Sequence, residues 1–342
     1  MVHYKVERNR FIWIDELRTF AIITMIFANS AAYFFEGEVN VSFRIFSSLA
    51  APLFIFLSGM NLFFSSEASS KKFITRGMYL LITASLIDIL AWQIFPFGTY
   101  DVLYLIAFGI MICGLCRFGW ISDLLIGVTL IALSLVFNLG YNFDITESLI
   151  SDNKGFSEIY NISVLKRAFI DGWFPIIPWI GYVFLGRATM AVVDRLKGVS
   201  TILGAIFVFG FSYYSLMIAE LNPVRSNYIE IFYPVSPLFV LLSFSFIFLA
   251  MRIAISQKDK KSNLIGKITS LGRKSLFVYL LHCFFISMLA DVFPVRGVSG
   301  LLLFCVLQLA SLFALTALFD SKFMIEKLEA FPRSLKVILG LK

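Results

Sequence analysis

Long apolar runs alternate with short polar or charged links along the whole chain. Ten runs can be separated in this way, each near or above the roughly 17–25 residues that a membrane-spanning helix needs. The expected spanning helices cover 12–34, 43–65, 73–95, 100–117, 119–140, 172–193, 199–220, 231–254, 274–295 and 298–319. The pattern therefore predicts an all-α polytopic membrane protein in which residues 1–342 form one integral-membrane domain.

Composition and charge narrow the class of partner. Hydrophobic residues make up 59% of the chain and aromatic residues 17%, which is more apolar surface than a soluble domain of this length can bury. The net charge of +7 could suggest nucleic acid, but the cations lie in short links between apolar runs. Such placement orients a membrane protein in the lipid bilayer, so no nucleic-acid partner is expected.

The charges of the links predict the orientation. Cations occur in the N-terminal tail, in alternate links and in the C-terminal tail, whereas the intervening links are acidic or nearly free of cations. The cationic links are 66–76, the link at Arg117, 187–198 and 252–274. Because basic links favour the cytoplasmic side, ten crossings would place both termini in the cytoplasm. The loop 141–171 would then be the one long external segment.

Three polar side chains stand at comparable depths in separate apolar runs. Asn29 ends the first run, Asp88 lies in the third and His282 in the ninth. An ionisable group at such a depth is costly and is by default a candidate for function, so a shared polar cavity is one explanation. The alternatives are a neutral His282 bonded to a facing helix, and an Asp88 that pairs locally or lies at the outer interface beside Trp92 and Gln93.

Charged groups gather at the cytoplasmic ends of the same runs. Asp15 and Arg18 are three residues apart and can form an ion pair on one helix face. Such a pair would anchor the helix end at the interface. Alternatively, Arg18 with Arg76 and Arg273 would form a cationic clamp for an anionic cofactor, because the guanidinium fork suits phosphate oxygens.

Four sequence blocks, in order, resemble the heparan-α-glucosaminide N-acetyltransferase-like family, within the acyltransferase-3-related superfamily. The first reads RFIWIDELR and continues to MIFAN, and the second reads APLFIFLSG. The third reads GWFPIIPWIG and continues to LG, and the last reads LGRKSLFVYLLH. These blocks cover 10–29, 51–59, 172–186 and 271–282.

The resemblance implies transfer of an acyl group, in most cases acetyl, from cytoplasmic acetyl-CoA to a hydroxyl or amine of an extracytoplasmic saccharide. It implies no metal, a bacterial inner membrane as the location, and a homodimer among the assemblies that the family allows. By the same resemblance, Asn29 and His282 line the site. In the mechanism we infer, His282 acts as the general base, Asn29 donates to the thioester oxygen, and Tyr279 or Ser275 orients the imidazole.

The chain also departs from the family pattern. Thr19 replaces the usual Gly after the opening Arg, and Leu103-Tyr104 replaces the usual Leu-His or Leu-Gln. The catalytic His of the first outward loop has no counterpart in residues 36–40. Glu36 and Glu38 of that loop, together with Trp179 of the third block, remain further candidates.

Two other classes of function stay open at this point. A transporter or flippase for a polar or lipid-linked solute would use His282 and Asp88 as a proton relay, although the sequence shows no convincing inverted repeat. A catalytically inactive membrane partner is the third class, because the loop His is missing.

Overall fold

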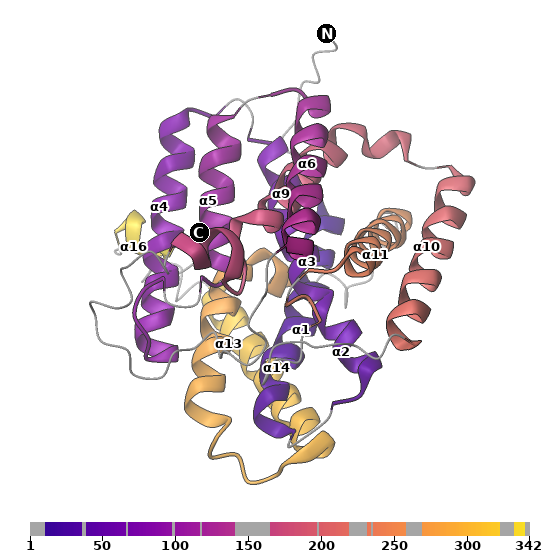
Figure 1. Cartoon of the computed structure of the whole chain (residues 1–342). Coiled ribbons are helices and arrows are strands. Elements are labelled where there is room, and N and C mark those ends of the chain that lie inside the picture. The colour runs from indigo at the N-terminus through magenta and orange to yellow at the C-terminus, as the bar shows by residue number, and fades with distance from the viewer. Residues whose placement is uncertain are drawn as a thin grey trace.

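The computed structural model describes residues 11–35, 39–65, 68–97, 100–116, 118–140, 165–196, 198–218, 231–233, 235–257, 269–321 and 332–338. Within these ranges every regular element is a helix, and the helices form one bundle (Figure 1). The long helices are α1 (Ile12–Phe34), α3 (Ala50–Phe63), α4 (Ser70–Ile87), α5 (Val102–Leu115), α6 (Trp120–Gly140), α9 (Ile176–Val192), α10 (Val199–Ile218), α11 (Pro237–Ser256), α13 (Ser275–Leu289) and α14 (Gly297–Phe319). Short elements are α2 (Val41–Ser48), η1 (Asp88–Trp92), η2 (Arg167–Asp171), η3 (Val193–Arg195) and α16 (Arg333–Ile338).

Each of the ten predicted segments contains one of these helices. Among the described residues, seven stretches are long and apolar enough to cross a membrane: α1, α2 with α3, α4 with η1, α9 with η3, α10, α11 and α14. The other three, α5, α6 over Trp120–Val136 and α13, are shorter apolar helices. The chain is therefore an all-α integral membrane protein, and crossing by all ten helices stays a prediction.

The main differences from the predicted boundaries lie where the backbone leaves α-helical geometry. The second segment is divided at Leu49 between α2 and α3. The third ends in the π-helical turn η1, after which Gln93 adopts a left-handed conformation with φ 55°. The sixth begins at Ile176 instead of residue 172, and Ile177 before Pro178 is extended, because a residue preceding proline disfavours helical angles. Hydropathy reports apolar length and cannot resolve such breaks.

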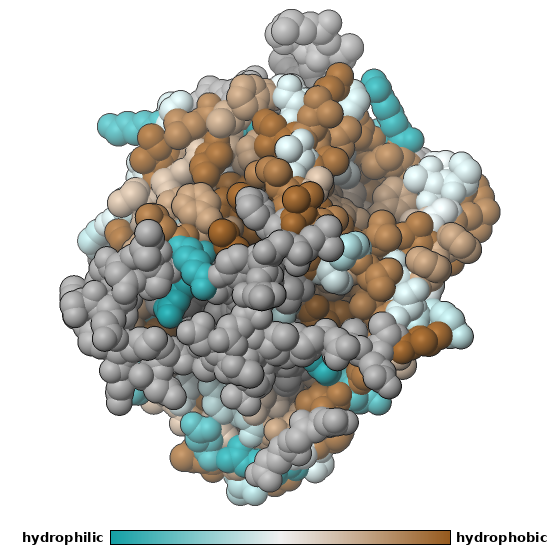
Figure 2. Space-filling view, viewed as in Figure 1, coloured by the Kyte–Doolittle hydropathy of each residue, from teal (hydrophilic) through white to brown (hydrophobic). Residues whose placement is uncertain are grey.

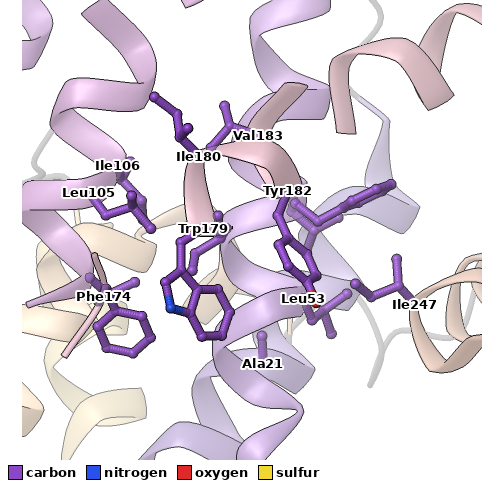
Figure 3. Close-up of a cluster of buried hydrophobic side chains, with 14 of the residues drawn as sticks. Ala21, Leu53, Leu105, Ile106, Phe174, Trp179, Ile180, Tyr182, Val183 and Ile247 are labelled. Carbon is purple, nitrogen blue, oxygen red and sulfur yellow. The ribbon is translucent and has the colours of Figure 1, made fainter. Parts of the chain in front are cut away.

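Two hydrophobic clusters make up the interior, and α1 contributes to both. The larger cluster joins α3, α5, α9 and α11 to the first half of α1, and Figure 3 shows its centre around Trp179 and Tyr182. The smaller cluster joins the second half of α1 to α14. Helix α13 also contributes to both clusters, with Tyr279 and Cys283 in the larger one and Val278 and Ile286 in the smaller one.

The outer surface is apolar, as a lipid-facing surface must be. Figure 2 shows brown, hydrophobic residues over much of the described part of one face. Helix α10 lies at the edge of the bundle beside α11 (Figure 1). Only 11% of its 18-residue apolar stretch is buried. Phe207 and Tyr214 on this helix are 73% and 66% exposed. Exposing so much apolar area to water would be unfavourable, whereas exposing it to the hydrocarbon of a bilayer is not.

Candidate functional site

The imidazole of His282 is held in one orientation by its own helix. The side chain is fully buried in the middle of α13, and Nδ1 lies 2.5 Å from the carbonyl oxygen of Tyr279. A carbonyl oxygen only accepts hydrogen bonds, so we assign the proton to Nδ1. Nε2 therefore carries the lone pair, which is the atom that a general base needs.

Asn29 of α1 meets that lone pair. Its amide Nδ2 lies 3.0 Å from Nε2 of His282, and with Nδ1 protonated the amide must be the donor. Asn29 is in the last two turns of α1 and is partly exposed, whereas His282 is not exposed. The structure thus brings together two of the predicted site residues across 253 positions of sequence.

Tyr279 links this pair to α5. Its hydroxyl donates to the Oδ2 atom of Asp101, a buried carboxylate at the N-cap of α5. The other oxygen of Asp101 accepts from the Val102 N–H at 2.6 Å. Asp101 was not singled out as a site residue in the sequence. The available signal was an Asp directly before an apolar helix, which is the preferred N-cap pattern.

Asp88 belongs to a neighbouring polar pair. The carboxylate is buried in η1 and accepts from the Tyr104 hydroxyl at 2.6 Å. Tyr104 in turn accepts from the Phe97 N–H at 3.0 Å. Neither ring nitrogen of His282 bonds to Asp88, so the structure favours local pairing of this carboxylate over a direct proton relay with His282.

Two further polar groups lie on elements that contact α13. Gln308 of α14 donates to the His282 carbonyl oxygen at 3.0 Å, while its own buried Oε1 has no hydrogen-bond partner among the described residues. The indole Nε1 of Trp92 in η1 is also buried and has no partner within the described ranges. Unpaired buried polar atoms are rare in proteins, and two of them here mark a region with unused hydrogen-bonding capacity.

A family comparison now bears on this geometry. The family model described as "Heparan-alpha-glucosaminide N-acetyltransferase, catalytic" matches residues 10–203, more than half of the chain. The chain belongs to this family. The comparison with curated proteins gives no match. Membership of this N-acetyltransferase family implies that the chain is a membrane acetyltransferase.

The match includes Asn29 but ends before α13. His282, Tyr279 and Ser275 therefore lie outside the residues that the N-acetyltransferase family model covers. What connects them to the family region is the bond from His282 to Asn29 and the bond from Tyr279 to Asp101.

Several glycines in the four family blocks serve close helix packing. A Cβ on Gly59 of α3 would lie 2.0 Å from the Val183 carbonyl oxygen of α9, and one on Gly186 would lie 2.1 Å from the Phe56 carbonyl oxygen. Gly272 approaches the Asp15 carbonyl oxygen in the same way. The glycines of these motifs therefore allow the close helix packing of the N-acetyltransferase fold.

The predicted cation clamp is spread over one end of the bundle. Arg18 is partly exposed and donates to Asp15 at 3.3 Å. Thr19, in place of the family's Gly, accepts from the Gly272 N–H at 3.0 Å and so joins the start of α1 to the turn before α13. Arg273 in that turn is exposed.

The remaining candidates lie elsewhere. Arg76 is exposed on α4, and Ser275 is partly buried at the start of α13. Trp179 is 1% exposed in the aromatic core, with ring contacts to Phe174 and Tyr182. Glu36 and Glu38 lie outside the described residues, as does loop 141–164. Within the described ranges, no three His, Cys, Asp or Glu side chains are grouped to hold a metal ion.

Proposed function

We propose that this protein transfers an acetyl group from acetyl-CoA on the cytoplasmic side to a sugar hydroxyl or amine on the far side of the membrane. The observation that carries the proposal is the bond between Asn29 and the Nε2 atom of His282. It puts a neutral imidazole with a defined lone pair next to an amide donor, inside a membrane acetyltransferase fold.

The reaction follows from these two groups. Nε2 of His282 accepts the proton of the acceptor hydroxyl or amine while its oxygen or nitrogen attacks the thioester carbonyl. Asn29 releases Nε2 and donates to the oxyanion, a contact worth about 3 kcal/mol in comparable sites. When the C–S bond breaks, the imidazolium returns its proton to the thiolate of CoA, so His282 ends the cycle neutral.

The distance from the basic end of the bundle to His282 and Asn29 suits a donor whose phosphate groups lie far from its thioester. From Arg273 to His282 the chain advances about 14 Å along a helix, and from Arg18 to Asn29 about 17 Å. Both paths lead from a basic end of the bundle to the Asn29–His282 pair. An acyl-CoA that keeps its phosphates at the basic end can extend its arm along this direction.

Contacts between links support an arrangement in which both termini lie on one side of the membrane, and the charges of the links favour the cytoplasm for that side. Links expected on the same side touch one another. On the cytoplasmic side, these contacts are Gly272 with Thr19 and Lys274 with Asp320. On the outer side, they are Arg296 with Tyr33 and Phe174 with Tyr100. With this orientation Asn29 lies nearer the outer end of α1, where a saccharide of a bacterial envelope would arrive.

The test compares wild-type protein with His282→Ala and Asn29→Ala in detergent. Each is incubated with radiolabelled acetyl-CoA and a panel of amino and neutral sugars, and both CoA release and sugar labelling are measured. The proposal expects loss of transfer in both variants while CoA binding and the unfolding temperature are kept. Transfer that survives His282→Ala would overturn the role of this histidine.

One observation favours the inactive-partner alternative. His282 is fully buried, and both of its ring nitrogens already have partners, as in a histidine that only packs. Wild-type protein that binds no acyl-CoA and releases no CoA with any acceptor would favour this alternative. Accumulation of a solute in proteoliposomes with alternating accessibility would favour a transporter.

A further inference from the structure

Arg252 has buried donors that no residue in the described part of the chain accepts from. It lies in the last two turns of α11, and its residue is only partly exposed. Its Nε and Nη1 atoms are both buried and have no hydrogen-bond partner in the part of the chain that the structure describes. A guanidinium is always charged, so each unpaired buried N–H costs stability.

The guanidinium group of Arg187, which is also partly buried, has several hydrogen-bond acceptors in the protein. Arg187 donates from Nε and Nη2 to the two oxygens of Asp123, at 2.7 and 2.5 Å, and also to the carbonyl oxygens of Cys113 and Cys116. The exposed Arg296 donates to three carbonyl oxygens near the other end of the bundle. Arg252 therefore differs from Arg187 and Arg296, whose guanidinium groups have acceptors in the protein.

The packing of α11 on α1 indicates at which end of the bundle Arg252 lies. Helices α1 and α11 contact each other, and the rings of Phe20 and Phe246 meet with centroids 5.9 Å apart. In the ten-crossing arrangement α1 and α11 run in opposite directions, so residues before Phe20 and residues after Phe246 lie toward the same end. Arg252 is thus at the end where α1 begins, on the same side of the bundle as Arg18.

We propose that Arg252 binds a phosphate group of the acyl donor. This inference rests on the proposed function for the identity of the ligand. Phosphate oxygens are acceptors that match the two unused donors, and the negative charge compensates the buried positive charge. Arg252, which the sequence alone did not single out among the cations, becomes a further member of the donor site.

The first experiment measures the dissociation constant of CoA and of pantetheine, which lacks phosphate, by calorimetry with purified protein. Arg252→Gln is expected to weaken CoA binding about tenfold or more, with no change for pantetheine. Lys71→Gln, which removes an exposed cation on α4, is the matched control and is expected to leave both constants unchanged. Equal CoA affinity in wild type and Arg252→Gln would overturn the inference.

A second experiment separates ligand binding from structure. Without ligand, Arg252→Met is expected to unfold at the same or a higher temperature than wild type, because replacing an uncompensated buried charge by an apolar group is often stabilising. With CoA present, the wild type should gain more stability than the variant. A lower unfolding temperature of the ligand-free variant would show a structural role for Arg252 and contradict the proposal.

The phosphate of a lipid has the same chemistry as the phosphate of CoA. Nanodiscs of neutral lipid and of anionic lipid therefore form the third arm. Stabilisation that follows the anionic lipid content, requires Arg252 and does not respond to CoA would overturn the donor assignment in favour of a lipid. If wild type binds no CoA in any arm, the proposed function fails together with the ligand. If wild type binds CoA and Arg252→Gln binds it equally, only this inference fails.

Discussion

The contact between α3 and α9 provides the sharpest test of the fold. Gly59 of α3 faces the Val183 carbonyl oxygen, and Gly186 of α9 faces the Phe56 carbonyl oxygen, so the two helices meet backbone to backbone at two reciprocal points. Replacing either glycine by alanine adds one methyl group at a place where only backbone can give way.

The size of the perturbation follows from the distances. A Cβ on Gly59 would lie 2.0 Å from the oxygen, whereas real Cβ atoms essentially never come closer than 3.0 Å. The helices must therefore separate locally by about 1 Å, and overpacking of this kind costs about 1–3 kcal/mol, occasionally more. Because one separation relieves both contacts, the double variant should cost at least about 0.5 kcal/mol less than the sum of the single variants.

The assay is reversible unfolding in mixed detergent micelles, followed by circular dichroism. The control is Gly204→Ala on α10, where a Cβ meets nothing within 4 Å. Alanine exceeds glycine in helix propensity by up to about 1 kcal/mol, so this control should be neutral or stabilising. The packing argument fails if Gly59→Ala unfolds like Gly204→Ala, or if the two interface substitutions are strictly additive.

Three further predictions concern the polar groups. Arg187→Gln leaves the buried Asp123 without its cation and should destabilise the protein by about 3–5 kcal/mol in the same unfolding assay; a loss under 1 kcal/mol would contradict this. Tyr279→Phe leaves Asp101 without its hydroxyl donor and should cost about 1–3 kcal/mol. Kinetics should show a lower kcat at an unchanged KM, because the hydroxyl is engaged with Asp101 and acts on His282 through its helix. A raised KM would speak against this. Asn29→Ala should lower kcat about 100-fold or more in the acetyl-transfer assay, and unchanged turnover would exclude an oxyanion role.

The sequence was informative about apolar length and poor about contacts. Long apolar runs have few structural options in a membrane, so each of the ten predicted segments contains a helix. The break at Leu49 and the π-helical turn at Asp88 depend on packing against neighbours, and hydropathy does not record packing.

The candidate site shows the same division. Asn29 and His282 could be paired in advance because residues at similar depths in two helices can meet. The partner of Asp88 could not be foreseen, because Tyr104 counts as an ordinary aromatic residue in any hydropathy pattern. The bond of Arg187 to Asp123 spans 64 residues, and helix rotation, which the sequence does not specify here, decides whether it forms.

Helices α1 and α13 each contribute to both hydrophobic clusters, and the Asn29–His282 bond joins these two helices. Helix α1 therefore connects two groups of packed helices, one built around α3 and α9 and the other around α14. A rotation or slide of the smaller group relative to the larger one would change the 3.0 Å distance between Asn29 Nδ2 and His282 Nε2. The distance between the imidazole and the amide therefore reports on the relative position of the two groups of helices.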